Sequence, residues 1–185
     1  MRSQRAGFLA GMALVAAVFA VAGTPVAFAA DAQLDAEAKA GLESLYQTSP
    51  TAKSLGETAK AILVFPKILK AGFIVGAMAG DGAMLSGGAT DGYYNIAAAS
   101  YGLQAGAQSF GYAMFLMTDS AVEYLRTTSG FELGVGPSIV VVDEGMAKTM
   151  STSTLQSDIY AFTFGQSGLM AGLGLQGTKI TKLKK

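Results

Sequence analysis

The sequence of 185 residues contains no cysteine and no histidine. Without cysteine the chain forms no disulfide, and the lipid modification that anchors bacterial lipoproteins through a cysteine is closed to it. The commonest ligands of zinc and other transition metals are missing, and neither a Ser-His-Asp group nor a Cys-His nucleophile can be built. We therefore expect no metal and no cofactor, and we expect that the protein is not an enzyme.

Charge is also scarce, because 13 basic residues balance 13 acidic residues and charged residues make up only 14% of the chain. This balance gives no general attraction to nucleic acid. Any partner that is recognised through charge has to meet a local patch of side chains.

The first 30 residues have the features of a secretory signal. Arg2 and Arg5 precede an uncharged apolar stretch over 6–22, and Ala27-Phe28-Ala29 fits a small-x-small cleavage site. We therefore expect a signal peptide over 1–29 and a periplasmic or secreted protein that is not a lipoprotein. The alternative is a retained anchor, although the apolar stretch lies at the lower limit of a membrane span. Without Arg2 and Arg5 the charge is −2, from 11 basic and 13 acidic residues.

Two helices are predicted before the first strand. Apolar residues at helical spacing give residues 31–48 one apolar stripe. Ser49-Pro50 is a typical N-cap followed by proline at the first helical position, so a second helix should run to about Lys60. Pro66 would break a helix, so regular helix has to end before it. The residues of the stripe are Leu34, Ala38, Leu42 and Leu45.

From Gly72 onward the sequence favours strands. Asp81-Gly82 and Asp91-Gly92 are typical of tight hairpin turns. Residues 93–117 carry no charge, which fits a sheet buried on both faces better than a membrane span, because asparagine, glutamine and glycine interrupt the stretch. The further expected elements are a short helix over 119–127 and strands over 137–142, 159–164 and within 169–181.

This order predicts an α+β fold. N-terminal helices pack on a mostly antiparallel, glycine-rich β-sheet that forms a sandwich or a partly closed barrel, with one inserted helix. The expected organisation is a signal peptide over 1–29, a helical segment over 30–54 and a main domain over 55–185. Gly172 to Gly177 match G-x-G-x-x-G, but the chain ends too soon afterwards for a dinucleotide-binding unit. The recurring glycines at 72, 76 and 80 are read as places where the sheet bends or is closely approached.

Lysines interrupt the apolar residues around 60–70. Lys60, Lys67 and Lys70 alternate with Phe65, Ile68 and other apolar residues, a pattern suited to the surface of an anionic bilayer. Lys179 and Lys182 in the basic tail are candidates for the same surface. The alternative is that the apolar residues belong to the core and the lysines only solubilise a sheet edge.

Several ordered segments resemble the SYLF-domain family, and together they cover about 55–180. They are residues 57–67 (ETAKAILVFPK), 71–76 (AGFIVG), 80–82 (GDG), 101–108 (YGLQAGAQ), 158–164 (DIYAFTF) and 168–172 (GLMAG). The resemblance implies lipid binding, with phosphoinositide or other anionic lipids in eukaryotic members and actin binding in some fungal members. Those members are cytosolic, so the export signal favours general phospholipid binding here and makes actin an unlikely partner.

The expected function is therefore the binding of anionic phospholipid, with Lys60, Lys67, Lys70, Phe65, Ile68, Lys179 and Lys182 as the lipid-binding residues. The first alternative is a structural or assembly protein of the cell envelope that acts by protein–protein contacts, including a homo-oligomer. The second is an enzyme that uses carboxylate, tyrosine or lysine chemistry around Asp158 or Asp91.

Overall fold

The computed structural model describes residues 26–184, apart from 73–74, 102–105, 129, 133–135, 143–145, 148–149, 151–155 and 169–177. Most of the predicted signal peptide and the G-x-G-x-x-G segment lie outside the described residues. The elements are α1 (Val26–Thr48), α2 (Pro50–Thr58), β1 (Ala61–Gly72), β2 (Val75–Ser86), β3 (Ala89–Tyr101), β4 (Gly106–Leu116), α3 (Asp119–Thr127), β5 (Phe131–Glu132), β6 (Ile139–Val142), β7 (Ile159–Gly168) and β8 (Lys179–Lys182).

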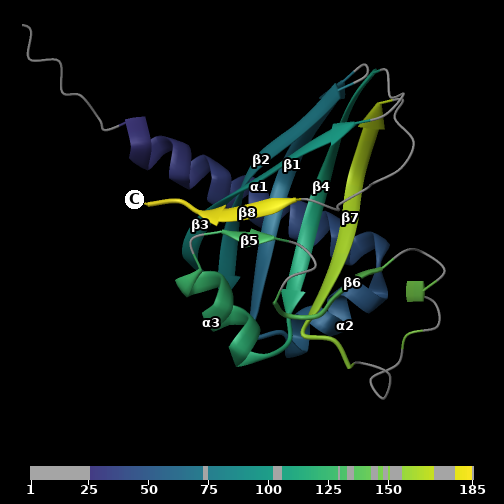
Figure 1. Ribbon diagram of the computed structural model, residues 1–185. Helices are drawn as coiled ribbons and strands as arrows, with labels where there is room; N and C mark the ends of the chain where they lie inside the picture. The colour runs from purple at the N-terminus through teal and green to yellow at the C-terminus, as the bar shows by residue number, and fades with distance from the viewer. Residues whose placement is uncertain are drawn as a thin grey trace, which may run out of the picture.

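All described strands join one sheet in the order β5-β8-β3-β2-β1-β4-β7-β6. Neighbouring strands are antiparallel except β6 and β7, which run parallel. The sheet curls, so that β8 and β5 cross in front of the long strands β1, β2, β4 and β7 (Figure 1). The predicted α+β class with N-terminal helices is confirmed, and the mixed, curled sheet resembles a half-barrel. The sandwich alternative is not confirmed.

Each face of the sheet has its own core. On the face that we call inner, side chains from β1, β3, β4 and β8 pack with Val122 and Leu125 of α3. On the opposite, outer face, other side chains of β1, β2, β4 and β7 pack with Leu42 and Leu45 of α1 and Leu55 of α2. The helices therefore lie on different sides of the sheet, α1 and α2 outside and α3 inside.

The helices α2 and α3 begin where the sequence predicts, whereas α1 begins at Val26, five residues before the predicted start at residue 31. Ser49 caps α2 by accepting a hydrogen bond from the Ala52 N–H at 3.2 Å, and Pro50 is its first residue. Thr118 caps α3 in the same way through the Ala121 N–H at 3.2 Å. Ala38, Leu42 and Leu45 of the predicted stripe in α1 are buried. These ends and faces follow from local sequence because the capping side chain and the apolar spacing lie within each helix.

The strand boundaries differ from the prediction. The first strand begins at Ala61, not Gly72, so Pro66 lies inside β1. Asp81-Gly82 lies within β2 and Asp91-Gly92 within β3, and neither pair makes a turn. The β2–β3 turn is Gly87-Gly88, whose φ angles of 58° and 84° are ones that glycine adopts without steric cost. The strand predicted over 137–142 is the shorter edge strand β6, whose Val141 is exposed although its β-branched sequence would suit a buried strand.

Pro66 is accommodated by a β-bulge in β1. Phe65 pairs with Tyr112 of β4 and Ile68 pairs with Phe110, so two residues of β1 stand opposite Gly111 alone. A proline that lacks an N–H donor fits a central strand at such an irregularity. The bulge shifts the alternation, and Phe65 and Ile68 both face the inner core.

Asp158 ties three segments together at the start of β7. Its carboxylate accepts hydrogen bonds from the Ser138 N–H at 3.0 Å, the Ser138 hydroxyl at 2.8 Å and the Thr118 hydroxyl at 3.1 Å. Ser138 precedes β6, and Thr118 caps α3. These hydrogen bonds, the one from the Ser138 backbone first, lower the pKa of the Asp158 carboxyl. The residue considered as a catalytic acid therefore has a structural role.

We expect Asp158→Asn to lower the free energy of unfolding at pH 7 by about 1–2 kcal/mol, because three hydrogen bonds to a charged carboxylate become weaker bonds to a neutral amide. Asp119→Asn is the matched control, because the Asp119 side chain is exposed and only forms an ion pair with Lys60 at 3.8 Å. It should change stability by less than about 1 kcal/mol. Chemical denaturation measures both variants. If Asp158→Asn left the free energy of unfolding unchanged, the structural role of Asp158 would be contradicted.

The same pair of proteins has a predictable pH dependence. Because the folded-state pKa of Asp158 lies below its ordinary value of 3.8, its stabilisation is complete above that value and is lost as pH falls through the folded-state pKa. The stability difference between wild type and Asp158→Asn should therefore shrink below about pH 4. A difference that stays constant into strong acid would rule out the carboxylate as its source.

Candidate functional site

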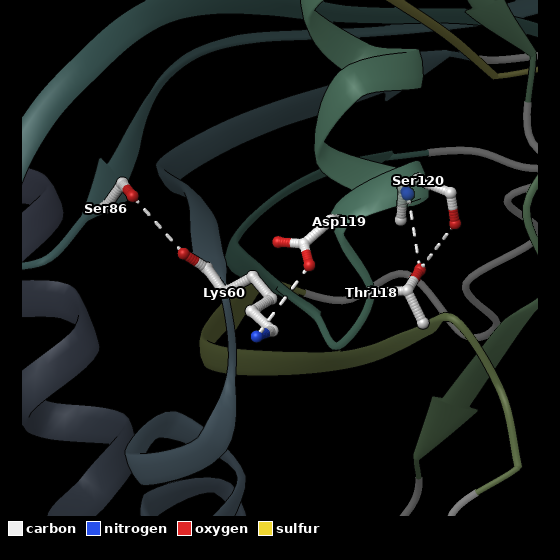
Figure 2. Close-up of polar contacts among 6 residues, drawn as sticks. Lys60, Ser86, Thr118, Asp119 and Ser120 are labelled. Atoms are coloured by element: carbon white, nitrogen blue, oxygen red, sulfur yellow. Dashed lines mark hydrogen bonds and ion pairs between the residues drawn. The ribbon is translucent and has the colours of Figure 1, made fainter.

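The lysines predicted to form one basic cluster are dispersed. Lys60 lies just before β1, at the opposite end of that strand from the β1–β2 connection. Its ammonium is 3.8 Å from the Asp119 carboxylate, and its carbonyl accepts a hydrogen bond from the Ser86 hydroxyl at 3.3 Å. Figure 2 shows these contacts beside the Thr118 cap of α3. Lys60 therefore belongs to the junction between β1, β2 and α3.

The expectation that Phe65 and Ile68 are exposed apolar wedges is wrong. Both are fully buried in the inner core, because the bulge turns both side chains inward. Lys70 is also buried, with only 5% of its surface exposed, and pairs across the sheet with Gln108 and Met78. The apolar anchor and one of the proposed cations therefore lie inside the molecule.

Lys67 has the opposite placement. It is exposed in the bulge and stands two residues before Leu69, which is 57% exposed on the outer side of β1. Lys67 and Lys70 thus point to different faces of the same strand. Of the three lysines near β1, Lys67 is the one that combines exposure with an exposed apolar neighbour.

The tail lysines also separate. Lys179 pairs with Ala97 of β3 and is exposed on the outer side, with Glu132 of β5 as its other neighbour. Lys182 pairs with Tyr94, whose side chain belongs to the inner core, so Lys182 lies on the inner face of β8. Lys179 is therefore the tail lysine that joins the outer face.

No helix or strand among the described residues covers the distal half of the outer face. Beyond α1, the long strands carry exposed small or apolar side chains that are paired with one another, as in Leu69 with Ala79 and Ala71 with Ala77. Figure 1 shows these ends of β1 and β2 reaching past the helices. We call this surface the alanine face: Leu69, Ala71, Val75, Ala77, Ala79, Ala97, Ala99 and Ala107.

The alanine face is apolar across four neighbouring strands. Leu69 and Val75 are its largest side chains, 57% and 56% exposed. Ser109 and Ser167 border it and share a hydrogen bond of 2.9 Å. Lys67 stands at its border on β1 and Lys179 beyond Ala97. Contiguous apolar surface of this kind marks an interaction site more often than scattered exposed residues do.

A cleft of about 380 Å³ adjoins the alanine face where α1 crosses the sheet. Lys67 and Asp81 line it from the sheet, one row of side chains away from the paired Leu69 and Ala79. Its other walls come from α1 and from the segment after β8. They are Asp31, Gln33, Leu34, Glu37 and Leu183, and Pro66 lies beside Lys67.

The other candidate catalytic groups have structural partners or are buried. The Asp91 carboxylate binds the Arg126 guanidinium at 2.8 Å and joins β3 to α3. Burial raises the pKa of Tyr94 to about 12 and that of Tyr112 further, so both phenols stay protonated at neutral pH. Within the described residues, no group of three or more acidic side chains gathers in a way that would hold a metal ion. None of the described helices has the length and apolar character needed to cross a membrane.

Sequence reasoning missed the alanine face because its signal lies in residues that looked unremarkable. Alanines at alternate positions, as in Val75-Gly76-Ala77-Met78-Ala79, indicate one face of a strand that carries only small side chains. The signal could be found once β2 was recognised as a single strand. The assumed turn at Asp81-Gly82 concealed its length.

Comparison with protein families gives one match, described as "Ysc84: Las17-binding protein actin regulator", over residues 97–185. Comparison with curated proteins gives no match. The matched segment includes most of the C-terminal half of the sheet, from the end of β3 through β4, β7 and β8, together with α3. This match agrees with the resemblance to the SYLF-domain family seen in the sequence, and it assigns residues 97–185 to a region similar to the Ysc84 (SYLF) domain.

Proposed function

We propose that the protein is an exported, non-enzymatic lipid-binding protein that associates with anionic phospholipid surfaces through the alanine face. The observation that carries the proposal is a contiguous, uncharged, exposed apolar surface with lysines at its border. Leu69 and Val75 enter the boundary of the acyl chains, and Lys67 and Lys179 remain at the level of the phosphates. This assignment replaces the buried Phe65, Ile68 and Lys70 as contact residues.

The charge arrangement supports an anionic surface. Both border lysines are exposed, and the alanine face itself carries no carboxylate, because the carboxylates that lie near Lys67 line the adjoining cleft instead. Each lysine close to an anionic membrane contributes about 1 kcal/mol. Two lysines and a modest apolar area give reversible association at the membrane surface.

The family description names Las17 binding and actin regulation. We do not extend actin binding to this chain, because the expected signal peptide would carry the protein away from cytosolic partners. Lipid binding, which the resemblance also implies, is compatible with a periplasmic or secreted location. It needs only a surface of the kind formed by β1, β2, β3 and β4.

Self-association through the same face is the second candidate. The small alanine side chains let another strand or sheet approach closely, and exposed apolar strands are common interaction surfaces. Light scattering distinguishes the two candidates. A stable dimer that binds no vesicles would favour the assembly role.

The apolar part of the proposal is tested by Leu69→Ser combined with Val75→Ser. We expect at least a tenfold loss of affinity for phosphatidylglycerol vesicles in co-sedimentation, because two apolar side chains no longer enter the bilayer. Val141→Ser is the control, since Val141 is also exposed but lies on the edge strand β6. Equal affinities for all three proteins would exclude the alanine face.

The electrostatic part is tested by Lys67→Gln combined with Lys179→Gln. At low salt the affinity for anionic vesicles should fall roughly 30-fold, the effect of losing about 1 kcal/mol for each lysine. The exposed helix lysines Lys39 and Lys53 provide a double glutamine control with the same change in net charge. At high salt the affinities of wild type and variant for anionic vesicles should become equal, because mobile ions screen the attraction between lysine and phosphate. Wild-type binding that is as strong to neutral vesicles as to anionic ones would contradict this part.

A further inference from the structure

The cleft beside the alanine face has a charge pattern that differs from that of a simple anion site. Three carboxylates, Asp31, Glu37 and Asp81, line it together with one cation, Lys67. A headgroup that carries only negative charge would be repelled by the carboxylates. A ligand that matches the cleft needs a cationic group and an anionic group a short distance apart.

Two of the carboxylates are held in place by neutral donors. Glu37 accepts a hydrogen bond from the Gln33 amide at 2.7 Å, and Asp81 accepts one from the Asn95 amide at 2.7 Å. Neither bond neutralises the carboxylate, and a carboxylate can accept further hydrogen bonds. The cleft therefore presents oriented negative charge from both of its sides, α1 and β2.

The position of the cleft limits the kind of ligand. Lys67 and Asp81 lie on the same outer side of the sheet as Leu69 and Ala79, in the adjacent row. A headgroup in the cleft would place the rest of its lipid over the alanine face without crossing a polar barrier. The apolar face and the charged cleft thus form one continuous surface for an amphiphile.

We propose that this cleft binds a primary-ammonium phosphodiester, the phosphoethanolamine headgroup. The phosphate lies against Lys67, and the ammonium donates hydrogen bonds to Glu37 and Asp81, while the acyl chains cover Leu69 and Ala79. A choline headgroup fits less well because its quaternary nitrogen has no N–H to donate. This inference rests on the lipid binding proposed above and adds headgroup selection to it.

The test compares vesicles that contain the same fraction of phosphatidylglycerol, with the remainder either phosphatidylcholine or phosphatidylethanolamine. The wild-type protein should bind the ethanolamine vesicles about tenfold more tightly, the effect of one or two charge-assisted hydrogen bonds. Glu37→Gln combined with Asp81→Asn should remove this preference and keep the binding to phosphatidylglycerol–phosphatidylcholine vesicles. Equal wild-type affinity for both vesicle types would overturn the inference while leaving the proposed function intact.

Ethanolamine lipids also change bilayer packing, and the variants separate that effect from recognition. A preference that survives Glu37→Gln with Asp81→Asn comes from packing and overturns the inference. Glu57→Gln combined with Glu123→Gln is the matched control, because both glutamates are exposed on helices and neither lines the cleft. This control should keep the full preference.

An experiment with a soluble headgroup tests the cleft without a membrane. It remains informative even if the protein binds no vesicles. Glycerophosphoethanolamine, but not glycerophosphocholine, should shift the amide NMR signals of Glu37 and Asp81 in the wild-type protein. Shifts without vesicle binding would keep the cleft as a site for the free headgroup and reject the membrane function. If no shifts appear and ethanolamine vesicles have no advantage, the cleft is not a headgroup site.

Discussion

The irregularity at Pro66 in β1 decides which side chains each face of the sheet presents. β1 lies between β2 and β4 in the middle of the sheet, where a proline removes a hydrogen-bond donor from the ladder. Pro66 lies in a bulge opposite Gly111, where the regular ladder of hydrogen bonds is interrupted. Beyond the bulge, successive side chains of β1 point to the faces opposite to those that regular alternation would give. Phe65 and Ile68 consequently both support the inner core, and Leu69 emerges on the outer side. Regular alternation would send Phe65 and Ile68 to opposite faces.

Glycines around the bulge provide the space that it requires. A Cβ atom on Gly80 would stand 2.7 Å from the Lys67 carbonyl oxygen, and one on Gly111 would stand 2.3 Å from the ring of Phe164. Real side chains do not approach so closely, so these strands need glycine where the bulge and the aromatic ring press against them. Part of the glycine content that looks like a repeat in the sequence is therefore a packing requirement of one irregular strand.

Local rules predicted the helices well and the sheet less well. Ser49-Pro50 and Thr118 identify helix starts because the cap and its N–H partner lie within one turn of each other. Asp81-Gly82 is equally local and was misleading, because pairing with Asn95 and Tyr94 across β3 extends β2 through it. The lysines illustrate the same limit. Their spacing among apolar residues predicts one basic surface, but the bulge and the pairing of Lys70 with Gln108 decide which cation is exposed, and these depend on distant strands.

In the proposed function, the outer face would combine stability with a binding surface on one sheet. Its proximal half carries large side chains such as Phe115 and Tyr160 under α1 and α2, whereas its distal half carries mainly alanines that lose little free energy by remaining exposed. The border lysines and the carboxylates of the cleft would then act over different ranges. Attraction of Lys67 and Lys179 to an anionic surface extends over about a Debye length and guides approach. Hydrogen bonds that Glu37 and Asp81 accept act only at contact, so in the proposed function they would select a headgroup after the surface has been reached. A weakly charged protein can therefore use a few cations for attraction and carboxylates for discrimination without the two effects cancelling.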